Sequence, residues 1–94
     1  INQGIKISPT TGFLVTSVAP GKVVYADHFK SYGKMIIIDH GRGLYTVYGH
    51  LNKFLIKKGR VDQGTQIAEL KRGDTLYFEI RNNGIPEDPM RWLK

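Results

Sequence analysis

The fold is decided by residues 35–51, which read MIIIDHGRGLYTVYGHL. Residues 35–40 and 44–50 are rich in β-branched and aromatic side chains, and a glycine-flanked Arg42 lies between them. This pattern predicts a β-hairpin. Ile36, Ile37 and Ile38 form a continuous apolar run, so we expect the first strand to be covered on both of its faces.

Short β-rich runs bounded by turn residues continue on both sides of this hairpin. We expect strands over residues 13–18, 22–26, 65–70 and 75–81, and one helical turn over residues 51–55. The sequence therefore predicts an all-β fold, a small antiparallel β-sheet sandwich or partly open barrel, in a single domain over residues 1–94. Because the chain starts abruptly at its first residue, we expect it to be part of a longer protein.

The composition is basic and contains no cysteine. Fourteen Lys and Arg against eight Asp and Glu give a net charge of +6, which favours an anionic partner such as an acidic protein face or cell-wall polymer. The basic residues are scattered without interleaved aromatics, so we expect no nucleic-acid binding. No apolar run approaches the length of about 18 residues that a membrane span needs, so we expect no membrane insertion by this domain. We also expect a monomer.

The three histidines lack the local spacing of a zinc site. His40 ends a strand at a turn, which predicts a structural role, and His28 is expected to be solvated in a loop. Alternation on residues 44–50 places Thr46, Tyr48 and His50 on one face. That face lines a groove or is a plain exposed polar face, and the residues alone leave both readings open.

Residues 75–81 alternate between polar and apolar side chains. Leu76, Phe78 and Ile80 are predicted to point into the core, whereas the opposite face carries Thr75, Tyr77, Glu79 and Arg81. This polar face has no pair of nucleophile and base of the Ser-His or Cys-His type. The residues thus predict a mixed polar and aromatic face without an evident catalytic set.

The order of short motifs resembles the LytM/M23 cell-wall metallopeptidases. The matching motifs are DHGRG at 39–43, YTVYGHL at 45–51, Val61-x-x-Gly64-x-x-Ile67, and LYFEIRNNGIPEDP at 76–89. They cover nearly the whole chain in the correct order. The resemblance implies the β-sheet core of that family.

The resemblance also implies that the zinc ligands of the family are replaced. At the positions of the family's HxGxD and HxH motifs, this chain has Asn2, Lys6 and Tyr77. An ammonium repels a metal cation, and a neutral phenol is a poor zinc ligand. We therefore expect no metal, no cofactor, no catalytic residue and no enzymatic activity.

Degenerate domains of this pattern resemble the murein hydrolase activators of the EnvC type. By that resemblance, the expected partner is a periplasmic N-acetylmuramoyl-L-alanine amidase in cell separation, docked in the former active-site groove of an extracytoplasmic protein. The expected contact residues are Lys6, Tyr32, Met35, Tyr48, His50, Tyr77 and Arg81. The alternatives are a scaffold domain, a peptidoglycan-binding module, or an active zinc endopeptidase that uses His40 and His50 as ligands.

Overall fold

Ten β-strands and one short 3₁₀ helix make up the described part of the chain. The computed structural model describes residues 5–7, 14–82 and 85–87, with side chains for 14–82. The elements are β1 (Ile5–Ile7), β2 (Leu14–Thr16), β3 (Gly21–Phe29), η1 (Lys30–Tyr32), β4 (Gly33–Gly41), β5 (Leu44–Leu51), β6 (Lys53–Phe54), β7 (Gly59–Val61), β8 (Gln66–Glu69), β9 (Leu76–Asn82) and β10 (Ile85–Glu87).

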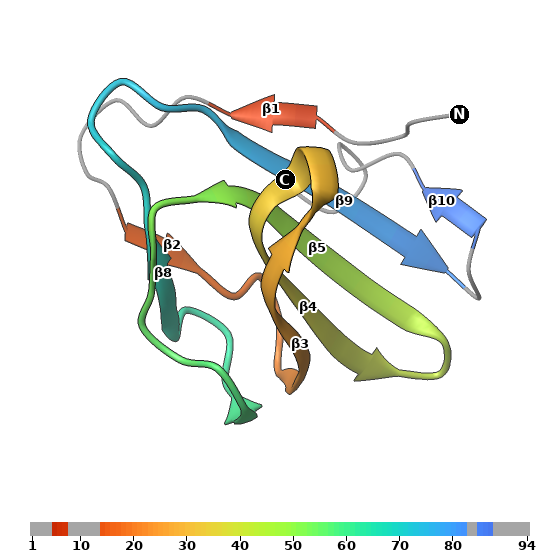
Figure 1. The fold of residues 1–94 in the computed structure, drawn as a ribbon. Helices are drawn as coiled ribbons and strands as arrows, with labels where there is room; N and C mark the ends of the chain where they lie inside the picture. The colour runs from red at the N-terminus through yellow and green to blue at the C-terminus, as the bar shows by residue number, and fades with distance from the viewer. Residues whose placement is uncertain (1–4, 8–13, 83–84, 88–94) are drawn as a thin grey trace.

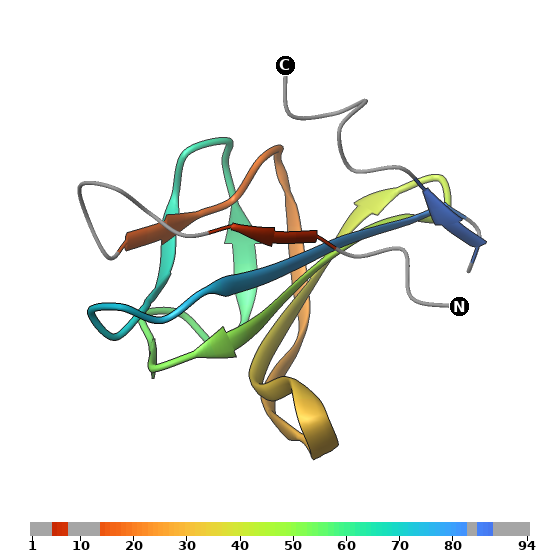
Figure 2. The ribbon, with the colours of Figure 1, turned by 90° about the horizontal axis from the view of Figure 1, so that it is seen from above.

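The strands form two antiparallel sheets, seen from two sides in Figure 1 and Figure 2. The large sheet has the order β1-β9-β5-β4-β3-β7, with β10 also paired to β9, and the small sheet has the order β2-β8-β6. The predicted all-β fold of small antiparallel sheets is confirmed, and neither sheet closes into a barrel within the described residues.

The hydrophobic core lies between the two sheets. Ile36 and Ile38 of β4 and Phe78 and Ile80 of β9 point inward and are at most 1% exposed. The small sheet contributes Val15, Ile67 and Ala68 to the same cluster. Each large apolar side chain buried in this way stabilises the fold by about 1.5–3 kcal/mol, so this layer holds the two sheets together.

The five strands expected from the sequence, β2, β3, β4, β8 and β9, are present, together with the predicted partner strand β5. The helical turn expected over residues 51–55 is wrong, because Lys53–Phe54 forms β6 and pairs with β8. The backbone N–H groups of Asn52 and Leu55 donate to the carbonyls of Glu69 and Ile67, both at 2.9 Å. Pairing with a neighbouring strand thus replaces the hydrogen bonds that a helical turn would make.

A chain of hydrogen bonds runs through the inner face of the large sheet. The His40 ring bonds through Nδ1 to the carbonyl of Pro20 and through Nε2 to the hydroxyl of Thr46, both at 2.7 Å. The Thr46 hydroxyl bonds to the Tyr48 hydroxyl at 3.1 Å, which also accepts the N–H of Val18 at 3.2 Å. Both ring nitrogens of His40 are therefore used within the fold, which confirms the structural role predicted for it.

The substitution Thr46→Val tests this hydrogen-bond chain. Valine has a similar shape but leaves Nε2 of His40 without its partner and removes one of the two hydrogen bonds to the Tyr48 hydroxyl. The free energy of unfolding should fall by about 1–3 kcal/mol, measured by urea denaturation.

Thr16→Val is the matched control, because Thr16 lies exposed on β2. Its free energy of unfolding should stay within about 0.5 kcal/mol of the wild type. Equal effects of the two substitutions would show that the hydrogen-bond chain does not stabilise the fold.

Candidate functional site

The outer face of the large sheet, away from the small sheet, carries the candidate site. On β9, Tyr77 and Glu79 face outward, opposite to the inward-facing Phe78 and Ile80. This is the division of faces that the alternation predicted. Tyr77 is 3% exposed and Glu79 is 1% exposed, so this face is covered by side chains rather than open to water.

The face of β5 that carries Thr46 and Tyr48, for which the residues alone left a groove or an exposed polar face open, is its core face. Thr46 and Tyr48 are 2% and 1% exposed, and the Tyr48 ring packs against Phe78 with centroids 5.4 Å apart. Tyr48 is therefore not a surface contact residue, because both its ring and its hydroxyl are used inside the fold. Tyr45 and Val47, on the opposite face of β5, line the outer surface.

His50 differs from the rest of this face because a β-bulge interrupts the alternation. Lys34 pairs with Leu51 and Ile36 with Tyr48, so Met35 faces both Gly49 and His50. His50 has a φ of 62°, and its ring lies 6.0 Å from that of Tyr77. The bulge thus places His50 on the outer face. The sequence predicted His50 as a contact residue from the family resemblance, without the bulge.

Gly49 permits the close packing of two rings over this bulge. A Cβ atom at this position would lie 3.4 Å from both the Tyr32 carbonyl oxygen and Cδ2 of Tyr77. The Tyr32 and Tyr77 ring centroids beside it are 5.1 Å apart.

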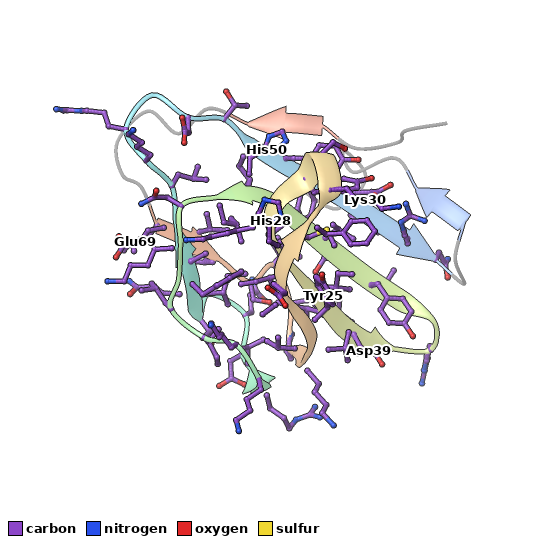
Figure 3. All side chains as sticks on the ribbon, viewed as in Figure 1. Tyr25, His28, Lys30, Asp39, His50 and Glu69 are labelled. Carbon is purple, nitrogen blue, oxygen red and sulfur yellow. The ribbon has the colours of Figure 1, made fainter. Side chains whose placement is uncertain are left out.

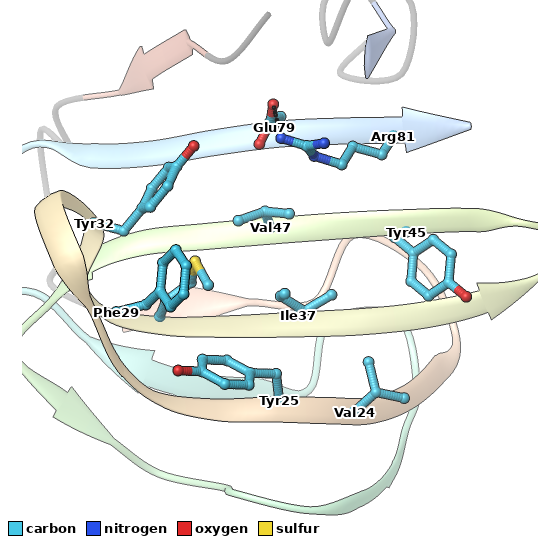
Figure 4. A pocket seen from close by; sticks show the side chains of 10 residues that line it. Val24, Tyr25, Phe29, Tyr32, Ile37, Tyr45, Val47, Glu79 and Arg81 are labelled. Carbon is cyan, nitrogen blue, oxygen red and sulfur yellow. Dashed lines mark ion pairs between the residues drawn. The ribbon is translucent and has the colours of Figure 1, made fainter. Parts of the chain in front are cut away.

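A groove of about 590 Å³ lies on this face, and we call it the outer groove (Figure 4). It runs across strands β3, β4, β5 and β9 and is mostly apolar. Its lining residues are Val24, Tyr25, Phe29, Tyr32, Met35, Ile37, Tyr45, Val47, Glu79 and Arg81. The apolar run of β4 is thus covered by the core on one face and forms the groove floor on the other.

Aromatic rings follow one another along the wall of the outer groove. The ring centroids of Tyr25 and Phe29 are 6.3 Å apart, and those of Phe29 and Tyr32 are 6.1 Å apart. Phe29 and Val24 are 39% and 50% exposed, which is high for large apolar side chains. A second bulge, between Val23 and Tyr25, lets Val24 and Tyr25 both line the groove.

The charged residues of the outer groove form an ion pair. Arg81 Nη2 lies 3.1 Å from Oε2 of Glu79, and the two side chains are 41% and 2% exposed. Glu79 Oε1 is buried and has no hydrogen-bond partner among the described residues. The guanidinium therefore lies at the surface, while the carboxylate lies below it.

His28 lies outside the outer groove, whose lining includes neither His40 nor His50. His28 is exposed, as expected, but it belongs to strand β3 rather than to a loop (Figure 3). Its backbone N–H donates to Oδ1 of Asp27 at 2.7 Å.

The sequence matches the model of Peptidase family M23 over residues 1–89. The chain belongs to this family. This M23 domain is 37% identical over 99 residues to the lipoprotein NlpD/LppB homolog of Pseudomonas aeruginosa, covering 99% of this chain and 33% of that protein. It is 33% identical over 97 residues to the murein hydrolase activator EnvC of Escherichia coli, covering 97% of this chain and 23% of that protein.

A solved structure supports the same fold. A zinc-containing peptidase from Vibrio cholerae has a TM-score of 0.81 and 31% identity, covering 94% of this chain and 29% of that chain. The M23 domain spans a third or less of the length of each of these three proteins. In the described part of the chain, no helix has the length and apolarity that a membrane crossing requires.

The Tyr77 side chain does not suit a zinc ion, because a neutral phenol is a poor zinc ligand. The backbone of Lys6 on β1 pairs with that of Tyr77 on β9. Among the described residues, no three His, Cys, Asp or Glu side chains gather as a metal site would require. His40 is committed to Pro20 and Thr46, so it does not serve as a ligand beside His50.

The structure brings together five of the seven expected contact residues, since Tyr32, Met35, His50, Tyr77 and Arg81 share the outer face. The backbone of Lys6 lies at the edge of the same sheet, its side chain and Asn2 lie outside the described residues, and Tyr48 lies in the core. The sequence prediction missed Val24, Tyr25, Phe29, Ile37, Tyr45, Val47 and Glu79. The apolar run at Ile36–Ile38 was the sequence signal that could have indicated this groove, because it gives β4 an apolar side chain on its outer face as well as on its core face.

Burial is the main cause that raises the pKa of Tyr77, and the Glu79 carboxylate and Tyr32 raise it further. In the unfolded chain this phenol ionises near a pH of about 10, so above that pH the folded state binds the proton more tightly. The contribution of protonated Tyr77 to the free energy of unfolding is therefore complete below pH ~10 and is lost as the pH rises further.

Tyr77→Phe should therefore reduce the loss of stability at high pH. Between pH 10 and 11, the free energy of unfolding of the wild type should fall by up to about 1.4 kcal/mol more than that of the variant. Urea denaturation across pH 7–11 measures this, with the pH 7 values as the internal reference. Parallel curves for the two proteins would contradict the raised pKa.

Proposed function

We propose that this M23 domain is a non-catalytic regulatory module that binds and activates an N-acetylmuramoyl-L-alanine amidase of the cell wall. The outer groove carries the proposal, because it offers exposed apolar and aromatic side chains, with Arg81 beside them, to a protein partner. Tyrosine and arginine are enriched among the residues that dominate binding energies at protein interfaces. The name of the EnvC relative, a murein hydrolase activator, supports a regulatory role in peptidoglycan hydrolysis.

We further propose that catalysis was lost through the replacement of zinc ligands by Asn2, Lys6 and Tyr77. The pairing of Lys6 with Tyr77 supports this, since it brings two of the three positions together across neighbouring strands. Without a metal, no water is activated and no amide carbonyl is polarised.

The proposed contact set is Lys6, Tyr32, Met35, His50, Tyr77 and Arg81, to which the structure adds the exposed Val24 and Phe29. We propose that the domain acts as a monomer in the periplasm or another extracytoplasmic space. The description of the Pseudomonas aeruginosa relative as a lipoprotein supports that location.

Phe29→Ala tests whether the outer groove docks the amidase. It removes an exposed ring that is 39% accessible, so little core packing is lost. With purified amidases of the same organism and dye-labelled murein, stimulation should require at least about fivefold more of the variant, which corresponds to about 1 kcal/mol of binding energy.

Leu55→Ala is the matched control, because Leu55 is 40% exposed and lies outside the outer groove. It should stimulate within about twofold of the wild type. If no amidase responds to the wild-type domain, the activator function is wrong; if both variants lose stimulation equally, the groove is not the docking site.

The proposed replacement of the zinc ligands predicts that the purified domain contains no stoichiometric zinc and does not cleave murein. The measurement is elemental analysis of protein prepared without chelators, followed by a murein digestion assay with added zinc. One zinc per chain together with murein cleavage would establish an active endopeptidase and reject the proposal.

A further inference from the structure

Glu79 is a buried carboxylate, and one of its oxygens accepts no hydrogen bond from the described residues. Oε2 pairs with Arg81 at 3.1 Å, and the Glu79 side chain is 2% exposed. Oε1 lacks a hydrogen-bond partner among the described residues. A buried carboxylate oxygen without a donor is costly in free energy, and each such group in a native fold requires an explanation. Oε1 is therefore a buried acceptor beneath the wall of the outer groove, and a ligand reaches it only when the side chains that cover it shift.

An apolar track leads across the sheet to this carboxylate. Strand pairing places Val47 beside Glu79, Ile37 beside Val47, and Tyr25 beside Ile37. All four line the outer groove, and Figure 4 shows Ile37 and Val47 between Tyr25 and Glu79. Two strand spacings separate Ile37 from Glu79, roughly 10 Å, so an unbranched alkyl stem can lie over the two aliphatic side chains and reach the carboxylate.

Charge selects the head group of such a ligand. Of the groove-lining residues that the structure describes, Glu79 alone carries a carboxylate. A cationic donor adds attraction between opposite charges to its hydrogen bond with a carboxylate, so it is favoured over a neutral donor. Arg81, 41% exposed, has room to shift its guanidinium toward solvent when a second cation arrives.

Building on the proposed amidase docking, we propose that the outer groove receives a lysine or arginine side chain of the amidase. Its methylene groups lie over Ile37 and Val47, and its cationic head donates a hydrogen bond to Oε1 of Glu79. Long cationic side chains pack in this way, with the stem on an apolar surface and the head on a polar group.

The test uses the chain itself and needs no amidase. Methyl NMR signals of Ile37 and Val47 are followed during titration with n-pentylammonium, with n-butylguanidinium as the arginine mimic and n-pentanol as the neutral control. The wild type should bind both cations at least about fivefold more tightly than the alcohol. Glu79→Gln should reduce this preference to near unity; equal affinities in the wild type, or a preference that survives Glu79→Gln, would overturn the proposal.

Arg81→Gln provides a variant with the opposite expected effect. It keeps the carboxylate but removes the resident cation, so the preference for ammonium over alcohol should rise above that of the wild type. Amide NMR spectra verify that both variants are folded. Should Glu79→Gln fail to fold, Arg81→Gln decides alone, and an unchanged or reduced preference rejects the proposal.

The source of the cation is tested with the amidase. Glu79→Gln should weaken amidase binding at least about fivefold in titration calorimetry. Unchanged amidase affinity would overturn the amidase as occupant. The same conclusion would follow if Glu79→Gln instead abolished self-association of the chain or its binding of murein fragments. Failure of the alkylammonium titration leaves the Phe29→Ala experiment as an independent test of the activator function.

Discussion

Strand β5 separates two side-chain layers, and the rest of the structure depends on how its backbone is paired. On its inner face, Tyr48 packs against Phe78 and joins the hydrogen-bond chain of His40. On its outer face, Tyr45 and Val47 line the groove. Because β5 lies between β4 and β9, a shift of one residue would exchange the two layers. The stability of the core and the shape of the groove are therefore set by the same pairing.

The sequence predicted the fold and part of the site for clear physical reasons. Alternation on β9 separates apolar Phe78 and Ile80 from polar Glu79 and Arg81, so its two faces were assigned correctly. Alternation on β5 could not be assigned in this way, because both of its faces carry apolar and aromatic side chains. Tyr48 was placed in the groove by the family resemblance, and the sequence does not reveal whether its hydroxyl faces water or Thr46.

Val24 and Tyr25 could not be predicted as groove residues because a backbone irregularity positions them. The bulge after Val23 brings both to the same side, and the bulge opposite Met35 turns His50 outward, which strict alternation does not predict. Bulges change which face a side chain occupies without a reliable sequence pattern. The groove is also assembled from four strands, so its residues are close in space but dispersed along the chain.

The turn between β3 and β4 has a consequence for how such domains diversify. Phe29 pairs with Gly33, and η1 between them begins with Lys30 at a φ of 42° and is followed by Gly33 at 65°. None of the η1 residues is buried, yet this turn and its neighbour Phe29 supply two rings of the groove wall. Substitutions of the η1 side chains can therefore reshape one wall of the groove with little loss of core packing, whereas the positive φ of Gly33 disfavours any other residue there. Domains that share this sheet can therefore differ in the shape of one groove wall through a single hairpin tip.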